Sequence, residues 1–166
     1  GTVGVCSTIM GPGATAMAGG ASYAYWERYP LLCLTECYGS AQAPMMSLQK
    51  IDHARLFNVF SKGSVTLDDG NPGRQIEDAI ALAETERPGP VHVDLPIDLM
   101  GREGLEASTA YRNDAAAASP QMTGDLDAIS DRINKADRPV LVVGPAVLRQ
   151  GAEVELLRLA EKLQLA

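Results

Sequence analysis

The chain has 166 residues with 14 Lys or Arg against 21 Asp or Glu, which gives a formal net charge of −7. This length suffices for one hydrophobic core and part of a second. The acidic balance and the lack of clustered basic residues argue against a nucleic-acid surface, and no apolar run reaches the ~18 residues of a membrane span.

The first elements predict a parallel sheet with packed helices. Residues 2–8 read as a strand, the turn Gly11-Pro12-Gly13 follows, and the small residues of 14–24 suit a helix that packs closely on a sheet. Residues 31–35 are a continuous apolar run, which is typical of a strand buried on both faces. The predicted fold class is therefore α/β, with a parallel sheet flanked by helices.

The next stretch continues the alternation of helices and strands. Residues 38–47 form a predicted loop, residues 48–57 resume helical spacing, and residues 64–67 suit a short strand. Asn71, as a cap before Pro72, predicts the start of a helix that returns the chain to a strand over 91–95. We predict one domain over residues 1–100.

A change of composition marks a second domain. Residues 101–122 are rich in Gly, Ala and Ser without apolar periodicity, which predicts a linker. Residues 123–166 then show a helical stripe at 126–133, a buried strand at 140–144 and a second helix at 154–163. We interpret them as the beginning of a Rossmann-like α/β domain. Because the first residues already read as a strand, we expect the chain to be a fragment of a longer polypeptide.

The glycine turn allows a dinucleotide hypothesis. Gly11, Gly13 and Ala16 have the G-x-G-x-x-A spacing, and Glu36 follows at a distance that suits a ribose-binding acid. Pro12 argues against it because proline offers no N–H to an anion. A simpler interpretation is that the glycines only shape a corner between strand and helix.

Several motifs together resemble one enzyme family. They keep their order and spacing from residue 1 to about residue 100, and 138–148 add a match to the start of a central domain. The motifs are Gly4-Val5-Cys6, Gly11-Pro12-Gly13-Ala14-Thr15, Tyr29-Pro30-Leu31, Leu34-Thr35, Leu48-Gln49-Lys50-Ile51-Asp52-His53, Ser61-Lys62 and Arg87-Pro88-Gly89-Pro90-Val91-His92-Val93-Asp94-Leu95-Pro96. The chain resembles the pyrimidine-binding domain of thiamine-diphosphate-dependent enzymes, in particular the acetolactate synthase group.

The resemblance implies a carboligase or decarboxylase of 2-oxo acids that uses thiamine diphosphate and Mg²⁺, with FAD in the central domain of some members. The Mg²⁺-bound diphosphate belongs to a domain absent here, and the family's catalytic glutamate is expected upstream. We therefore expect this fragment to be inactive alone, with no catalytic residue of its own. The resemblance also implies a cytoplasmic homodimer or homotetramer.

The resemblance assigns site residues one by one. Gly11, Pro12 and Gly13 match the loop beside the cofactor's pyrimidine ring. Gln49 matches a glutamine near the reacting centre, and Lys62 matches a lysine at the substrate channel. The alternatives are a solvated residue on a helix face for Gln49 and an exposed charge for Lys62.

Other polar residues are interpreted as structural. His53 and His92 lack a paired acid or nucleophile in sequence, so we predict no catalytic role for either, and Asp94 is expected to cap a turn or to pair locally. The three cysteines are expected to be reduced, with Cys33 and Cys37 buried, and no metal site is predicted because no set of ligands has a suitable spacing.

The chain departs from the family pattern at three places. Ile9-Met10 replaces Thr-Ser, Ala16 replaces Asn, and Glu36-Cys37 replaces Gly-Gln. These changes remove hydroxyl and amide groups near the expected site and add a charge that is costly to bury unless it is paired. They keep open a different 2-oxo acid or acyl substrate, and also a non-catalytic homologue.

Overall fold

The computed structural model describes residues 2–102 and 124–165, which lie in two units. The first unit is built on a sheet with the strand order β1-β2-β4-β3, and every pair of neighbouring strands is parallel. The strands are β1 (Gly4–Thr8), β2 (Leu31–Cys37), β3 (Ser64–Thr66) and β4 (Pro90–Pro96). This all-parallel sheet confirms the predicted α/β class.

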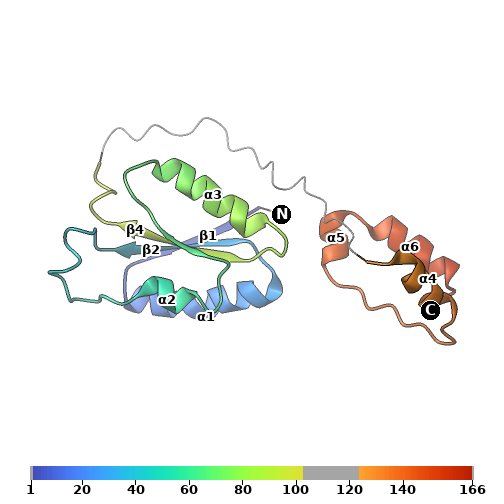
Figure 1. Cartoon of the computed structure of the whole chain (residues 1–166). Helices are drawn as coiled ribbons and strands as arrows, with labels where there is room; N and C mark the ends of the chain where they lie inside the picture. Colours follow the sequence, from blue (N-terminus) through green and yellow to red (C-terminus); the bar gives the residue numbers. More distant parts are fainter. Residues whose placement is uncertain (1, 103–123, 166) are drawn as a thin grey trace. The chain divides into compact units, whose positions relative to one another are not determined.

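Helices cover both faces of this sheet. Figure 1 shows α1 (Pro12–Glu27) and α2 (His53–Phe57) on one face and α3 (Pro72–Glu84) on the other. A sheet that is covered on both faces buries most of its central strands, which explains the apolar run at the start of β2 and the nearly complete burial of β4. The core therefore consists of two layers, one on each side of β2 and β4.

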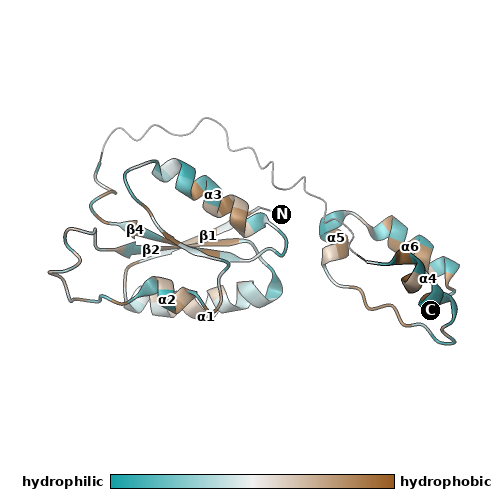
Figure 2. Cartoon of the chain, viewed as in Figure 1, coloured by the Kyte–Doolittle hydropathy of each residue, from teal (hydrophilic) through white to brown (hydrophobic). Residues whose placement is uncertain are grey.

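The two core layers use side chains of different size. Under α1 and α2 the buried cluster contains Ala14, Ala21, Cys33 and Phe57, and the small alanines allow α1 to lie close to the strands. Under α3 the cluster consists of larger aliphatic residues and two alanines of the helix: Leu32, Leu67, Ala79, Ala83, Val91 and Val93. Figure 2 shows that the second half of α3 is more hydrophobic than its first turn.

Most predicted elements of the first unit are confirmed, and one is wrong over half its length. Only residues 53–57 of the predicted helix 48–57 are helical, because Asp52 caps α2 by accepting a hydrogen bond from the Arg55 amide at 2.9 Å. Upstream of this cap Gln49 has a positive φ of 54°, which ends any regular helix. The predicted cap of α3 is confirmed, since the Asn71 side chain accepts from the Arg74 amide.

The second unit contains α4 (Leu126–Asn134), α5 (Ala146–Gln150) and α6 (Glu153–Lys162). The predicted helices 126–133 and 154–163 correspond to α4 and α6, whereas the predicted strand 140–144 is wrong. These residues form no strand, and Val142 is 90% exposed. The described part of this unit contains no strand that could pair with them. Most of the predicted linker, 103–122, lies outside the described residues.

None of the helices among the described residues is long and apolar enough to cross a membrane. The three cysteines form no disulfide, and Cys33 is buried while Cys37 is half-buried. Burial raises the pKa of the Cys33 thiol, and burial together with the carboxylates of Asp94 and Asp98 raises the pKa of Cys37 to about 12. These thiols are therefore protonated and unreactive near neutral pH.

Candidate functional site

The glycine turn lies between the carboxyl end of β1 and the first turn of α1. Gly11 has φ 64° and ψ −107°, a conformation that is strained for any residue with a side chain. Its carbonyl oxygen accepts the Thr15 amide at 3.0 Å, and Pro12 occupies the first helical turn, where no N–H is needed. The turn is thus a sharp, preformed start of α1 at the carboxyl edge of the sheet.

Both glycines of the turn are required by close packing against the chain itself. A Cβ atom on Gly11 would collide with the Gln49 carbonyl oxygen and lie 2.9 Å from the Gln49 Cβ. A Cβ atom on Gly13 would collide with the Thr8 hydroxyl. The interpretation of the glycines as a strand-to-helix corner therefore accounts for both positions.

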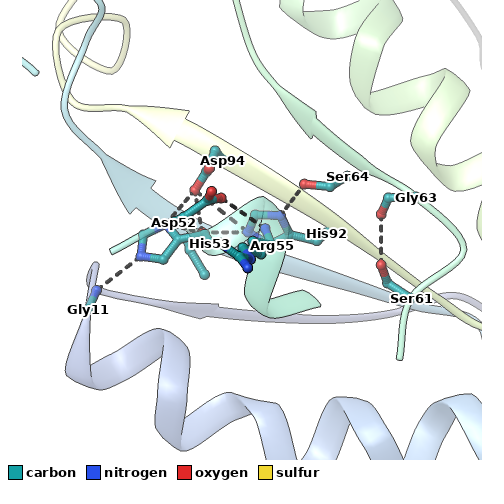
Figure 3. A network of polar contacts seen from close by, with 10 residues as sticks. Gly11, Asp52, His53, Arg55, Ser61, Gly63, Ser64, His92 and Asp94 are labelled. Atoms are coloured by element: carbon teal, nitrogen blue, oxygen red, sulfur yellow. Dashed lines mark hydrogen bonds and ion pairs between the residues drawn. The ribbon is translucent and has the colours of Figure 1, made fainter. Parts of the chain in front are cut away.

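A buried histidine holds the turn. The Gly11 N–H donates to Nε2 of His53 at 3.0 Å, across 42 positions of sequence. Because Nε2 accepts this bond, the proton of the neutral ring is on Nδ1, which lies 2.8 Å from Oδ1 of Asp94 and donates to it. The backbone amide of Gly11 therefore determines the tautomer of His53, and Figure 3 shows the three residues in line.

A second row of hydrogen bonds reaches the same carboxylate. The Thr35 hydroxyl donates to Oδ1 of Asp94 at 2.6 Å, so the contact of 2.8 Å between Thr35 Oγ1 and His92 Nε2 is a bond donated by the histidine. Nδ1 of His92 then carries no proton and accepts from the Ser64 hydroxyl at 2.6 Å. Each donor in this network has an acceptor.

The surroundings of His92 keep it uncharged. Its ring is fully buried and stacks on Phe57 with the ring centroids 4.3 Å apart. Burial lowers the pKa of His92 to about 4, although the Asp94 carboxylate acts in the opposite direction and His53 adds a small lowering effect. A neutral His92 with a proton on Nε2 is the form that the hydrogen bonds require.

No sequence pattern predicted this network. Asp94 was expected to cap a turn or to pair locally, and this prediction is wrong because its partners lie 41 and 59 positions away. The available signal was the parallel register, which sets Thr35 of β2 beside Asp94 of β4 at the carboxyl end of the sheet. The segment 53–57 that brings His53 to them has no such signal.

His53, His92 and Asp94 also form a candidate metal site. One nitrogen of each histidine and a carboxylate oxygen of Asp94 lie within 4.8 Å of one another. A metal bound to Nδ1 of His53 would move the ring proton to Nε2, where it would face the N–H of Gly11. Because the existing hydrogen bonds satisfy all three residues without a metal, the arrangement favours a polar network.

Gln49 and Lys62, the two predicted substrate-side residues, lie at different ends of the sheet. Gln49 is exposed in a turn rather than on a helix face, and its backbone contacts Gly11. Lys62 lies at the amino end of β4, because its amide bonds to the Pro90 carbonyl. Its ammonium group donates to the Leu82 carbonyl and, at 2.5 Å, to the Thr85 carbonyl at the end of α3. The structure brings Gln49, but not Lys62, to the glycine turn.

Two exposed apolar residues are close in sequence to Gly11 and Gln49. Ile9, two residues before Gly11, is 50% exposed, and Leu48, next to Gln49, is 71% exposed. A separate apolar cavity of about 160 Å³ lies between the ends of β3 and β4 and the start of α3, and it contains neither Gly11 nor Gln49.

Comparisons with known proteins give one consistent result. No protein-family profile matches the chain. A probable acetolactate synthase large subunit of Methanocaldococcus jannaschii is 32% identical over 167 residues, which are 97% of this chain and 28% of that protein. Acetolactate synthase isozyme 1 large subunit of Escherichia coli K12 is 31% identical over 163 residues, with 97% and 28% coverage. The chain is an acetolactate synthase homologue, matched over one segment.

The relatives of this acetolactate synthase homologue also include a glyoxylate carboligase of Escherichia coli O157:H7, which is 29% identical over 163 residues covering 97% of the chain. The chain spans less than a third of the length of each of these relatives. The matches confirm the resemblance that the sequence motifs indicated.

Proposed function

We propose that the chain forms the pyrimidine-side part of a thiamine-diphosphate-dependent carboligase or decarboxylase that acts on 2-oxo acids. The observation that carries the proposal is the match of 97% of the chain to acetolactate synthase and glyoxylate carboligase sequences. When bound, thiamine diphosphate supplies a nucleophilic carbon and an electron sink for cleavage next to a carbonyl group. Mg²⁺ on the diphosphate, FAD in some members, and a dimer or tetramer complete the proposal.

Within this proposal, the residues of the chain bind and orient. Gly11, Pro12 and Gly13 form the turn beside the pyrimidine ring, and the side chains of Ile9 and Leu48 cover the ring and exclude water. Gln49, whose backbone contacts Gly11, offers its amide group toward the reacting centre. The chemical step itself is assigned to groups outside these 166 residues.

The hydrogen bonds of the turn argue against dinucleotide binding. A Rossmann turn presents its backbone N–H groups to a pyrophosphate. Here the Gly11 N–H already donates to His53, and Pro12 has no N–H. We therefore retain the thiamine diphosphate proposal over the oxidoreductase alternative.

Calorimetric titration of the full-length protein with thiamine diphosphate tests the proposal, with and without Mg²⁺ and with NAD as the control ligand. We expect micromolar, Mg²⁺-dependent binding of thiamine diphosphate and no binding of NAD. Release of CO₂ from pyruvate and from glyoxylate then identifies the 2-oxo acid. Binding of NAD alone would favour the oxidoreductase, and binding of neither ligand would favour a non-catalytic homologue.

A further inference from the structure

We propose that His53, held by Asp94, is a positioning residue that fixes the glycine turn in the shape that receives the cofactor. The inference rests on the proposed function for the identity of that cofactor. It rests on the structure for the mechanical link itself, in which the N–H of Gly11 donates to a buried imidazole nitrogen at 3.0 Å.

The turn needs such a link because its conformation is unfavourable. The first N–H groups of a helix have no acceptor within the helix, and Gly11 adopts φ 64° and ψ −107° just before α1. His53, 42 positions later in the chain, provides the acceptor for the N–H of Gly11. The side chain of Asp52 caps α2 and so fixes the backbone where His53 begins the helix.

Two residues of one short segment, Gln49 and His53, contact Gly11. The backbone of Gln49 lies against the Cα of Gly11 so closely that no side chain fits there. His53, four positions later, binds the N–H of the same residue. Residues 49–53 therefore form a clamp around Gly11.

Hydrogen bonds attach the clamp to the two central strands of the sheet. His53 donates to Asp94 on β4, and Asp94 in turn accepts from Thr35 on β2, so the two central strands hold the carboxylate. A site held by such supporting hydrogen bonds keeps its geometry when the cofactor arrives. His53 is only 4% exposed and its Nε2 is occupied, so it positions the turn and does not reach the substrate.

The test compares His53→Leu, His53→Gln and His92→Asn in the full-length protein. Leu fills space but accepts no hydrogen bond, whereas the amide oxygen of Gln can accept from Gly11. His92→Asn disturbs the same buried network without touching Gly11 and is the matched control. Hydrogen–deuterium exchange resolved to single amides measures the protection of Gly11, and the Val93 amide in β4 reports global opening.

We expect His53→Leu to speed the exchange of the Gly11 amide about tenfold beyond any change at Val93, and to weaken binding of thiamine diphosphate about tenfold. His53→Gln is expected to restore part of the protection of the Gly11 amide and part of the affinity for thiamine diphosphate. His92→Asn is expected to change Gly11 and Val93 in parallel. Unchanged relative exchange of Gly11 in His53→Leu would overturn the clamp.

The two readouts separate this inference from the proposed function. Faster Gly11 exchange with unchanged cofactor affinity would overturn the positioning role while leaving the cofactor itself in place. Failure of the unmodified protein to bind thiamine diphosphate would remove the proposed function and, with it, the cofactor role of His53. The exchange data would still decide whether the clamp exists.

Discussion

At the scale of single residues, the glycine turn shows that a glycine motif can be required by packing within the protein rather than by a ligand. Gly11 and Gly13 are needed because Gln49 and Thr8 occupy the space where their side chains would lie. The sequence motif was correct about where a tight turn stands, but the spacing alone contains no information about which groups press against it. Gln49 lies 38 positions after Gly11, and Thr8 lies at the end of β1.

Gly11→Ala is expected to destabilise the fold by about 2–4 kcal/mol, since it adds backbone strain and a collision with Gln49. Gly19→Ala is the control, because Gly19 lies in the exposed part of α1 and a Cβ there meets nothing within 4 Å. That substitution should stabilise by up to about 1 kcal/mol. Urea unfolding of both variants measures the difference, and equal effects would contradict the described packing.

His92 predicts a dependence of stability on pH. Its pKa falls from 6.5 to about 4 on folding, so between these values the unfolded chain binds more protons than the folded one. The contribution is complete above pH 6.5 and is lost as the pH falls toward 4, by up to about 3 kcal/mol.

The free energy of unfolding should therefore decline between pH 6.5 and 5 by about 1.4 kcal/mol per pH unit from this residue. Comparison with His92→Asn isolates the effect, because other groups titrate in both proteins. Urea titrations at several pH values provide the measurement. Parallel curves for the two proteins would show that His92 is not buried in its neutral form.

At the scale of elements, the strands and long helices of the first unit were predictable, whereas α2 and the network were not. A continuous apolar run predicts β2, the alternating pattern of residues 91–95 predicts β4, and Asn71 before Pro72 predicts the start of α3, because these signals are local. α2 has five residues and is defined by its cap and by its contacts with the sheet. The convergence of His53, Thr35 and Asp94 depends on tertiary folding, which local patterns do not contain.

The Lys62 side chain caps the carboxyl end of α3. Its ammonium group binds two carbonyls at the carboxyl end of α3, where a positive charge is favourable, although burial lowers the pKa of Lys62 while Glu86 opposes that shift. Lys62→Met is expected to destabilise by about 1–2 kcal/mol.

Lys135→Met is the matched control, because Lys135 makes an exposed ion pair with Asp131 at 3.4 Å. Its loss should cost less than about 0.5 kcal/mol. Thermal unfolding of both variants tests the difference. A negligible effect of Lys62→Met would show that the helix end does not depend on this contact.

At the scale of the whole molecule, the two units differ in how much they bury. The first unit has two core layers around its sheet, whereas none of the described residues of the second unit, 124–165, is buried. This explains why the sequence predicted the first unit well and misjudged 140–144 in the second. An apolar run becomes a strand only when a neighbouring strand accepts its hydrogen bonds.

We expect a peptide of residues 120–166 to show weak helicity and no cooperative thermal transition in circular dichroism. Its helices have 9, 5 and 10 residues, which is short for stability without a packed core. Residues 1–102 are the control and should melt cooperatively, because they contain both core layers. A sharp transition of the peptide would show that the second unit folds without further partners.

The buried network also has a polarity. One row of hydrogen bonds runs from Ser64 through His92 and Thr35, another runs from Gly11 through His53, and both end on the same oxygen of Asp94. The carboxylate is thus the common terminus of two converging rows, and no donor in them can reverse unless its whole row reverses. A proton placed on that oxygen would take one of its acceptor positions, so at least one of the two rows would lose its acceptor. The charge state of one carboxylate in β4 is thereby coupled to the shape of a backbone turn beyond the end of β1.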